Sequence, residues 1–345
     1  MKLAVVILNW NGEKMLKEYL PSVVEYSRED NVTVYVADNA STDGSLEWIK
    51  NNCPSVRLIA LSENFGFAGG YNAALKEISS DYYLLLNSDV KVTPNWLQPL
   101  IAFMDSHPAV AACQPKLLSM MEPESFEYAG ACGGFLDHWG YPFCRGRIFN
   151  TVEKDHGQYD VPLHLFWATG AALMIRSDDY WAAGALDERF FAHMEEIDLC
   201  WRLRRMNREI VCIPQSSVFH LGAATLKKEN PHKTFLNFRN NLLMLYKNLP
   251  EDELKAVMNV RSVLDFIAAL VFVLKGDVKN AWAVYRAHRE YSRMKPSFFF
   301  DRKRYPSEIE QKNIRERVCG SILYSYYILR KRTFAELTEK KVVET

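Results

Sequence analysis

Length, composition and charge exclude several classes of protein at the outset. The chain has 345 residues, enough for one large α/β domain with additions or for two domains. Its 42 basic and 42 acidic residues give a formal net charge of zero, which argues against bulk electrostatic attraction to nucleic acid. Seven cysteines without a Cys-x-x-Cys pair indicate neither a disulfide framework nor a zinc site, so we expect a reduced, cytoplasmic chain.

The first ninety residues alternate between apolar strands and helical patterns. Strands are predicted at residues 3–8, 32–37, 56–61 and 82–86, and residues 3–8 are too short for the apolar core of a signal peptide. This alternation predicts an α/β sandwich with three loops gathered on one edge of the sheet. The three loops carry Asp38, the glycine-rich residues 66–72, and Asp89.

The strand at residues 82–86 ends abruptly in Asn87-Ser88-Asp89. A buried strand that ends in this way delivers a carboxylate to the sheet edge, where parallel sheets keep their ligands. Mg²⁺ and Mn²⁺ commonly hold a substrate diphosphate through only one or two carboxylates, so Asp89 alone is a sufficient anchor. A strand end closed by an Asx turn is the alternative interpretation.

The middle of the chain is less regular until residue 167. Residues 120–164 lack clear periodicity, and residues 130–146 are expected to be a loop-dominated insertion that could set acceptor specificity. A returning strand is predicted at residues 167–175, a strand with a terminal histidine at residues 218–222, and a helix at residues 235–247.

A helix predicted at residues 194–206 begins with an unusual concentration of acid. Glu195, Glu196 and Asp198 repel one another there unless the helix dipole, a cation or a substrate offsets the repulsion. Asp198 is expected to pair with Arg202 one turn later, which leaves the two glutamates for chemistry.

Seven segments, taken in order, resemble the inverting family 2 glycosyltransferases with the GT-A fold, especially their bacterial rhamnosyltransferase-like branch. These segments are Val6 to Gly12, Asp38 to Ser45, Asn64 to Asn72, Leu86 to Asp89, Thr169 to Ala171, Glu195 to Leu199, and Arg239-Asn240. They cover roughly residues 1–245. Each is weak alone, but their shared order is a strong signal.

The resemblance implies an α/β, GT-A nucleotide-diphospho-sugar transferase fold, with a mixed central sheet flanked by helices at residues 1–249 and a helical C-terminal extension at residues 250–345. The implied reaction is inverting transfer of a sugar from a nucleotide-sugar donor, such as dTDP-rhamnose or a UDP-sugar. The implied acceptor is a hydroxyl of a glycan or lipid-linked saccharide in surface polysaccharide biosynthesis. The implied donor contacts are Asn9, Asp38, Asn64, Gly66, Asn87, Ser88 and Arg239.

The same resemblance assigns the metal and the base. Asp89 would bind Mg²⁺ or Mn²⁺ on the donor diphosphate, with His220 either a further ligand or a structural strand-end histidine. Glu196 aligns with the catalytic base, and Glu195 is the second choice. Arg239 is expected either to contact the departing diphosphate or to form a structural ion pair.

Two departures from the family pattern leave other functions open. Asn87 replaces the first acid of the metal motif, and Glu195-Glu196 replaces the usual Glu-Asp. A catalytically inactive carbohydrate-binding or scaffold protein is therefore one alternative. A nucleotidyltransferase is the other, although the chain has no Walker motif.

Composition changes after Pro250. Residues 263–274 are apolar but interrupted by Asp265, and no apolar run is expected to span a bilayer. Residues 278–288 form a second, amphipathic stretch with basic neighbours. Either these segments form a helical subdomain packed on the catalytic core, or they contact the inner face of the cell membrane, which would suit a lipid-linked acceptor.

Overall fold

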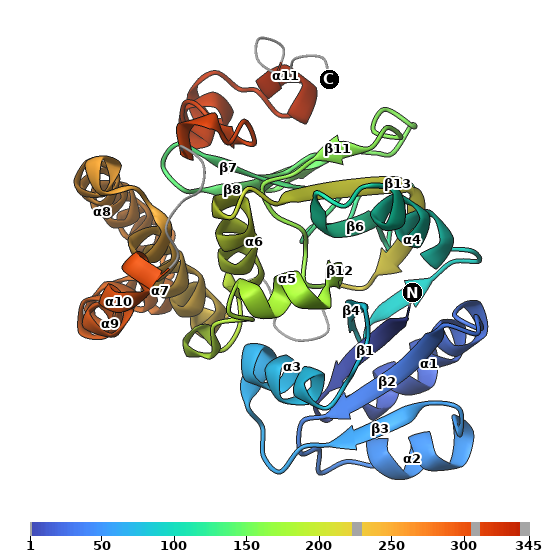
Figure 1. Cartoon of the computed structure of the whole chain (residues 1–345). Coiled ribbons are helices and arrows are strands. Elements are labelled where there is room, and N and C mark those ends of the chain that lie inside the picture. The colour runs from blue at the N-terminus through green and yellow to red at the C-terminus, as the bar shows by residue number, and fades with distance from the viewer. Residues whose placement is uncertain (1, 223–229, 305–310, 339–345) are drawn as a thin grey trace.

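A mixed sheet of nine strands forms the centre of the computed structural model, which describes residues 2–222, 230–304 and 311–338 (Figure 1). The order is β11-β13-β6-β12-β4-β1-β2-β3, and β5 pairs with β13. The strands are β1 (Leu3–Asn9), β2 (Val32–Asp38), β3 (Arg57–Ala60), β4 (Tyr82–Asn87), β5 (Val90–Val92), β6 (Val110–Ser119), β11 (Leu163–His164), β12 (Ala172–Arg176) and β13 (Glu209–His220). The first four predicted strands are confirmed, each within one residue of its expected ends.

The sheet is covered on both faces, which explains why β1 is a continuous apolar run. Leu3, Val5 and Ile7 belong to one buried cluster, whereas Ala4 and Val6 belong to the other. The first cluster is completed by α1 (Glu13–Tyr26), α2 (Ser45–Asn52) and α4 (Leu97–Ser106), and the second by α3 (Gly66–Lys76), α5 (Ser177–Ala182) and α6 (Glu195–Arg205). The first helix continues through its internal proline without ending there.

Three parallel strands finish at the same edge of the sheet. β1 pairs in parallel with β2 and with β4, so Asn9 lies opposite Asp38 and Leu8 lies opposite Asn87. β12 runs antiparallel to β4 and begins at this edge. The loops after β1, β2 and β4 therefore converge at the place where open α/β sheets bind ligands. The sequence predicted this convergence for the loops after β2, β3 and β4, and β3 pairs in parallel with β2 and ends opposite Asp38 at the same edge.

A second, smaller sheet takes two of its strands from the insertion expected at residues 130–146. The other residues of this segment are turns and irregular structure, so the prediction of a loop-dominated insertion missed only these strands. The five strands of the sheet are β10 (Thr151–Val152), β9 (Arg147–Ile148), β8 (Pro142–Cys144), β7 (Gly134–Asp137) and β14 (Arg317–Val318). Phe135 and Phe143 bury their rings there. Strands of two to four residues are too short to show the alternating pattern by which strands are predicted. The strand expected from residue 167 also begins later, at Ala172.

Helices follow the two sheets, grouped at the left of Figure 1. They are α7 (Pro231–Asn248), α8 (Glu251–Leu274), α9 (Val278–Met294), a 3₁₀ turn η2 (Lys295–Phe298) and α10 (Phe299–Arg304). α7 and α8 each pack against α9. Within the described ranges, α8 alone is long and apolar enough to cross a membrane, by length and composition only. The expectation that no run has the required length is therefore wrong by that criterion.

The last described residues return to the second sheet. β14 pairs with β7, and Tyr326 and Thr151 join their hydroxyls 2.8 Å apart. The remaining elements are η3 (Gln311–Asn313), the π-helical turn η4 (Tyr324–Ile328), α11 (Phe334–Thr338) and the early turn η1 (Glu188–Phe190). The division of the chain after residue 249 stays a prediction, to which the structure adds that residues 317–318 pair with a strand of the N-terminal part.

Candidate active site

Asn9 and Asp38 meet side by side at the ends of β1 and β2. The Asn9 amide donates to one oxygen of Asp38 at 2.8 Å, and the backbone N–H of Ser41 donates to the other at 2.9 Å. Asp38 is buried, and the amide oxygen of Asn9 is buried without a hydrogen-bond partner among the described residues. A buried acceptor left unpaired in this way costs free energy, so this corner is suited to accept a donor group from a ligand.

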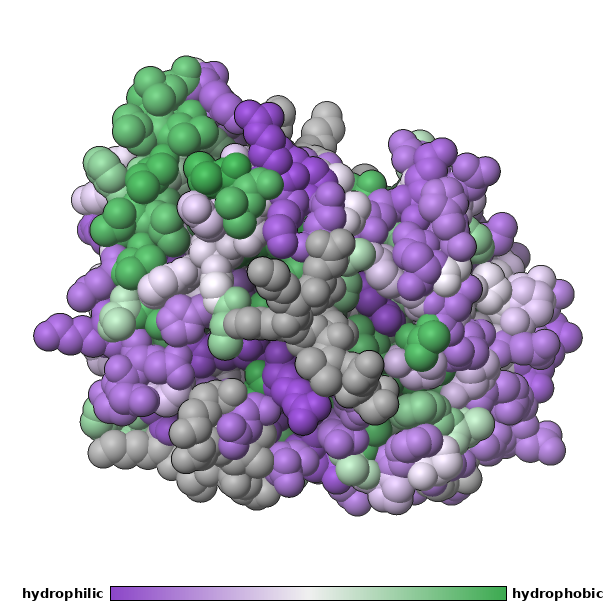
Figure 2. Space-filling model, turned by 90° about the horizontal axis from the view of Figure 1, so that it is seen from above, coloured by the Kyte–Doolittle hydropathy of each residue, from purple (hydrophilic) through white to green (hydrophobic). Residues whose placement is uncertain are grey.

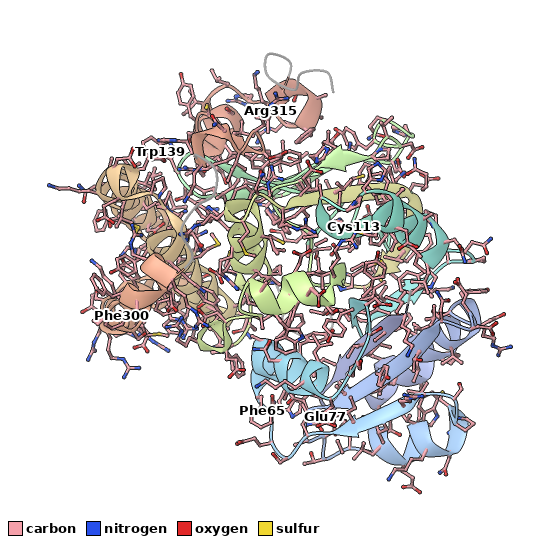
Figure 3. The ribbon with its side chains drawn as sticks, viewed as in Figure 1. Phe65, Glu77, Cys113, Trp139, Phe300 and Arg315 are labelled. Carbon is pink, nitrogen blue, oxygen red and sulfur yellow. The ribbon has the colours of Figure 1, made fainter. Side chains whose placement is uncertain are left out.

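The turn that leads into the glycine-rich start of α3 is fixed by amide side chains. Asn39 donates to the side-chain oxygen of Asn64 at 2.9 Å and to the backbone oxygen of Gly66 at 3.0 Å. Gly66 has a φ of +72°, and a Cβ at this position would lie 2.6 Å from the ring of Phe191. Only glycine satisfies both the backbone conformation and the close contact. Phe65, which begins this turn, is labelled in Figure 3.

Asp89 and His220 form a buried pair across neighbouring strands. The histidine Nε2 lies 3.1 Å from the Asp89 Oδ1, and its Nδ1 lies 3.3 Å from a carboxylate oxygen of Glu127. Burial opposes a charge on His220, but hydrogen bonds and charge attraction from Asp89 and Glu127 outweigh it and raise its pKa to about 10. The amide of Asn87 is 3.5 Å from the same Nε2.

This pair would hold a divalent cation completed by a substrate if the cation displaced the proton that His220 shares with its two carboxylate neighbours. Two ligand atoms that occupy adjacent octahedral positions at about 2.1 Å from Mg²⁺ stand about 3 Å apart, and the Asp89 and His220 atoms have this separation. A carboxylate on the second ring nitrogen, here Glu127, is the usual support of a metal-binding histidine. The described residues contain no cluster of three or more His, Cys, Asp or Glu side chains able to hold a metal. The remaining ligands would therefore come from a diphosphate and water.

Two glutamates at the start of α6 differ in exposure and in pKa. Glu195 is buried, and burial together with the charge of Glu196 raises its pKa well above the usual value. Glu196 is partly exposed, and desolvation raises its pKa to about 7 although nearby backbone N–H groups stabilise its carboxylate. A carboxylate with a pKa near 7 is matched to general-base catalysis at neutral pH.

The loop that delivers these glutamates is bent and tightly held. Phe191, His193 and Met194 all have positive φ angles, of 66°, 70° and 73°. Asn240 of α7 donates through its side-chain nitrogen to the backbone oxygens of residues 190, 192 and 193, at 3.0, 2.8 and 2.7 Å. Arg239 donates to the same oxygen of residue 190 and to Asn240. Left-handed residues cost about 1–3 kcal/mol each, so this clamp stabilises a conformation that the loop alone would avoid.

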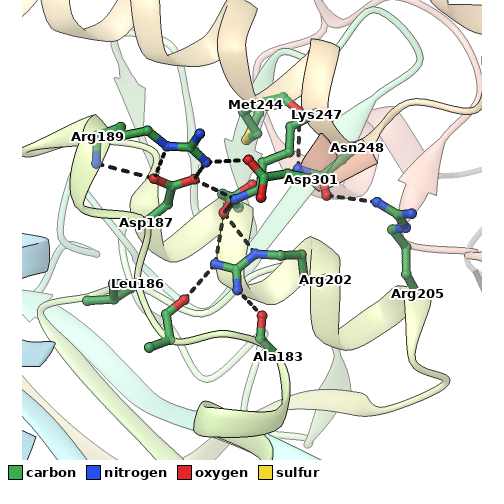
Figure 4. A network of polar contacts seen from close by, with 12 residues as sticks. Ala183, Leu186, Asp187, Arg189, Arg202, Arg205, Met244, Lys247, Asn248 and Asp301 are labelled. Carbon is green, nitrogen blue, oxygen red and sulfur yellow. Dashed lines mark hydrogen bonds and ion pairs between the residues drawn. The ribbon is translucent and has the colours of Figure 1, made fainter. Parts of the chain in front are cut away.

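Asp198 is committed to a structural network, as its spacing from Arg202 predicted (Figure 4). It also accepts from Lys247 at 2.8 Å and from Asn248 at 2.7 Å, and Lys247 reaches Asp187 at 2.7 Å. Burial alone would raise the pKa of Asp198, but its cationic neighbours lower it. The network ties α6 to α7 and leaves Glu195 and Glu196 as the acids available for chemistry.

Gly170 lies between Glu196 and the strand end that carries Asn87. A Cβ on this residue would lie 3.9 Å from the Cβ of Glu196, and the next backbone oxygen, on Ala171, accepts from the N–H of Asn87 at 3.0 Å. The ring of Phe67 lies 3.2 Å from the same Cβ position, and its backbone N–H donates to the backbone oxygen of Phe191. Gly170 therefore lies among three segments, which are the start of α3, the Asn87-Ser88-Asp89 turn and the start of α6.

The structure brings most of the predicted residues to one sheet edge. Asn9, Asp38, Asn64 and Gly66 share one hydrogen-bonded corner, and Asn87, Asp89 and His220 share another, with Ser88 in the turn facing Gly12. Arg239 lies behind the Glu196 loop and contacts backbone there, so its contact with a diphosphate stays a prediction. Sequence reasoning missed Glu127, Asn39 and the clamping role of Asn240. Asn39 and Asn240 could have been found only because they follow the predicted residues Asp38 and Arg239. No predicted residue lies next to Glu127 in the sequence.

Residues 4–157 match the family described as "Glycosyl transferase family 2". The prediction of a family 2 glycosyltransferase is thereby confirmed for residues 4–157. This transferase is 25% identical over 236 residues to an N-acetylglucosaminyl-diphospho-decaprenol L-rhamnosyltransferase of Mycobacterium tuberculosis, which covers 63% of this chain and 75% of the relative. It is also 25% identical over 248 residues to the low-salt glycan biosynthesis hexosyltransferase Agl10 of Haloferax volcanii, over 70% of this chain and 74% of the relative.

Solved structures establish the fold of the transferase. GalNAc-T7 with UDP, GalNAc and Mn²⁺ superposes with a TM-score of 0.59 at 14% identity, over 89% of this chain and 58% of that one. S. aureus TarS 1–349 in complex with UDP-GlcNAc gives a TM-score of 0.55 at 16% identity and covers 88% of each chain. The predicted GT-A fold, a mixed sheet flanked by helices with further helices at the C-terminus, is thereby confirmed.

Proposed function

We propose that this glycosyltransferase moves a sugar from a nucleotide-sugar donor, dTDP-rhamnose or a UDP-sugar, to a hydroxyl of a glycan or lipid-linked acceptor, with inversion at the anomeric carbon. The observation that carries the proposal is the position of Glu196. It stands partly exposed with a pKa near 7, beside the strand end that presents Asn87 and Asp89. The rhamnosyl preference and the role in surface polysaccharide synthesis rest on similarity to the named relatives.

Each end of the site has a distinct task in this proposal. Asn9, Asp38, Asn64 and Gly66 bind the nucleotide, while Asp89 and His220 hold Mg²⁺ or Mn²⁺ against the diphosphate. A cation bound there supplies charge neutralisation for the departing diphosphate. The structural neighbours GalNAc-T7 and a Pyrobaculum calidifontis mannosyltransferase were crystallised with Mn²⁺, which supports this cofactor class.

Glu196 acts on the acceptor. Its carboxylate takes the proton of the acceptor hydroxyl as that oxygen attacks the anomeric carbon, and the bond to the diphosphate oxygen breaks with its electron pair leaving on the nucleoside diphosphate. Positioned general-base catalysis of this kind contributes about 100- to 10,000-fold in rate. A single displacement inverts the configuration, because no carboxylate forms a covalent intermediate. Glu195, which is buried and has a pKa raised well above its usual value by burial and by the charge of Glu196, is the second choice for the base.

A donor screen tests the proposal. Purified protein is incubated with Mg²⁺ or Mn²⁺ and each common nucleotide sugar, and nucleoside diphosphate release is followed with and without EDTA. We expect metal-dependent release from one donor, loss of transfer in Glu196→Gln with donor affinity retained, and a smaller effect in the neighbouring Glu195→Gln. Pyrophosphate release would instead favour a nucleotidyltransferase, and donor binding without turnover would favour an inactive binding protein. Retention of anomeric configuration in the product would overturn the single displacement.

The proposed location is the cytoplasmic side of the cell. The cysteines support it, because all seven are free thiols and six of them are buried. Fractionation of cells that produce the tagged full-length chain tests this location. The chain and its release of nucleoside diphosphate should be found in the cytoplasmic and membrane fractions. Recovery of the chain outside the cytoplasmic and membrane fractions would contradict this location.

A further inference from the structure

Helix α8 has its polarity reversed relative to a water-exposed helix. Its fully buried positions are Val257, Arg261 and Asp265, so two of the three are charged, while Leu254 and Met258 are partly buried and pack against the core. The opposite side is exposed and apolar over the C-terminal half, at Val263, Phe266, Ile267, Leu270, Val271, Val273 and Leu274. These positions recur every three or four residues, which places them along one stripe of the helix. A surface helix of a soluble protein instead buries its apolar side and exposes its charged side to water.

The stripe continues onto α9 through a glycine turn. Gly276 has a φ of +78°, and beyond it Val278, Trp282 and Tyr285 are exposed on successive turns of α9. The rings of Trp282 and Tyr285 stack with their centroids 4.9 Å apart. We call these ten side chains of α8 and α9 the apolar face. Figure 2 shows a large hydrophobic patch on the left of the molecule, the side that α8 occupies in Figure 1.

The size of the exposed groups sets the apolar face apart from ordinary surface. Phe266 is 71% exposed, Leu274 is 78% exposed and Trp282 is 58% exposed. On α10, Phe300 is also exposed and lies at the outer edge of the same helical group (Figure 3). Contiguous patches of this kind mark interaction surfaces, because single exposed apolar residues would not gather by chance into one stripe.

A buried ion pair holds α8 against the protein. Asp265 accepts from Arg261 at 3.3 Å and from His288 of α9 at 3.0 Å, and the hydroxyl of Tyr141 lies 3.5 Å away. The Arg261 guanidinium stacks 3.8 Å above the Tyr141 ring. If α8 crossed a bilayer, Arg261 and Asp265 would enter hydrocarbon without His288 and Tyr141, their partners outside α8, which is costly. The ion pair therefore favours a helix that lies along a membrane over one that crosses it.

Charge around the apolar face is complementary to an anionic surface. Between residues 263 and 295 the chain has six Lys and Arg against three Asp and Glu. All six basic residues, Lys275, Lys279, Arg286, Arg289, Arg293 and Lys295, are exposed, whereas none of the three acids is fully exposed. Basic residues beside an apolar stripe bind anionic lipid, and Trp and Tyr prefer the boundary between headgroups and acyl chains.

We infer that the apolar face of α8 and α9 lies in the surface of an anionic lipid bilayer, with the helices parallel to the membrane. This docking goes beyond sugar transfer and does not depend on it. It also deepens the proposed function, since α7, which packs on α9, carries the Asn240 that clamps the Glu196 loop. Membrane docking would hold the start of α6 at a fixed position relative to the bilayer, as transfer to a lipid-linked saccharide requires.

Vesicle co-sedimentation of the full chain tests the docking without any turnover. The probes are phosphatidylcholine vesicles with and without phosphatidylglycerol. We expect binding to the anionic vesicles, weakened about tenfold or more by the pair Phe266→Ser and Leu270→Ser, because each loses apolar area from the membrane. The pair Lys275→Glu and Lys279→Glu should weaken binding to a similar extent on anionic vesicles only.

Controls keep docking separate from folding and from catalysis. Val161→Ser removes an equally exposed apolar residue far from α8, and Lys50→Glu reverses an exposed charge on α2, so both should bind as wild type does. Circular dichroism and donor turnover in detergent-free solution should be unchanged in the Phe266 and Leu270 variant. Equal binding by this variant and by wild type would overturn the inference. Resistance of the membrane-bound protein to alkaline carbonate extraction would overturn the inference in favour of a membrane-spanning α8. Dimerisation of wild type that is lost in the Phe266 and Leu270 variant would overturn it in favour of a second copy of the chain bound at the apolar face.

Discussion

Replacing Asn240 by Ala should disable the Glu196 loop more than it destabilises the fold. The Asn240 amide group has two N–H bonds, which it shares among three backbone oxygens at 2.7–3.0 Å. In the variant the oxygen of Phe190 keeps its bond from Arg239, so only the oxygens of Ala192 and His193 lose their protein donor. At about 1–2 kcal/mol for each partly buried acceptor, the expected loss of stability is about 2–4 kcal/mol.

The loop itself should respond strongly, because its three left-handed residues depend on this clamp. A displacement of the Glu196 carboxylate by about 1 Å can cost about 100-fold in rate, so we expect kcat for donor turnover to fall by about 10- to 100-fold while the donor KM changes little. Stability is measured by urea unfolding, and kcat and KM are measured by nucleoside diphosphate release. These two readouts separate misplacement of the base from general unfolding.

Asn241→Ala provides the matched control for this measurement. Asn241 is buried in the next position of the same helix, but its amide donates to a single backbone oxygen, that of Gly140, at 2.9 Å, and contacts the loop only through the sulfur of Met194 at 4.0 Å. We expect it to lose about 1 kcal/mol of stability and little kcat. If Asn240→Ala and Asn241→Ala had the same kcat, the proposed role of Asn240 in positioning the loop would be refuted, whatever their stabilities.

Three further variants test other parts of the site. In wild type, kcat/KM should rise as pH increases through about 7, because only the deprotonated carboxylate of Glu196 accepts a proton, and Glu196→Gln should abolish this rise. The raised pKa of Glu196 in the folded state also lowers the stability of wild type as pH rises from about 4.5 to 7. The variant should therefore lose less stability than wild type over that interval. Lys247→Met should lower the free energy of unfolding by about 3–5 kcal/mol, because it strips the cation from two buried carboxylates. Gly66→Ala should weaken donor binding. It should also lower stability by more than the cost of about 1–2 kcal/mol expected for alanine in a left-handed conformation, because its Cβ would also meet the Phe191 ring. Gly276→Ala has open space around the added Cβ, so it should show only the cost of the left-handed conformation.

Each of these variants has a result that would count against its reasoning. A pH profile of Glu196→Gln that matches wild type would move the base to another residue. Unfolding of Lys247→Met at the wild-type urea midpoint would mean that the network in Figure 4 contributes no net stability. Equal stability losses for Gly66→Ala and Gly276→Ala would show that the loop yields to the added methyl group.

Local patterns were enough to predict the parallel half of the sheet and the residues at its edge. Each of β1, β2 and β4 is an apolar run that ends in Asn or Asp, and strands of this kind bury both faces and expose their ends. Asp198 and Arg202, one helical turn apart, were likewise predicted to pair from their spacing alone. These features are encoded over distances of a few residues, so a single sequence reveals them.

Contacts between distant segments were beyond the reach of such patterns. Glu127 faces His220 from 93 positions away, and Asn240 clamps a loop that begins 50 positions earlier. The strands of the second sheet are too short to show a period, and one of them comes from residues 317–318. The reversed polarity of α8 is also invisible in sequence, because apolar residues favour burial in every pattern rule. Only the folded chain decides that Arg261 and Asp265 face inward and that Phe266 and Leu270 face out.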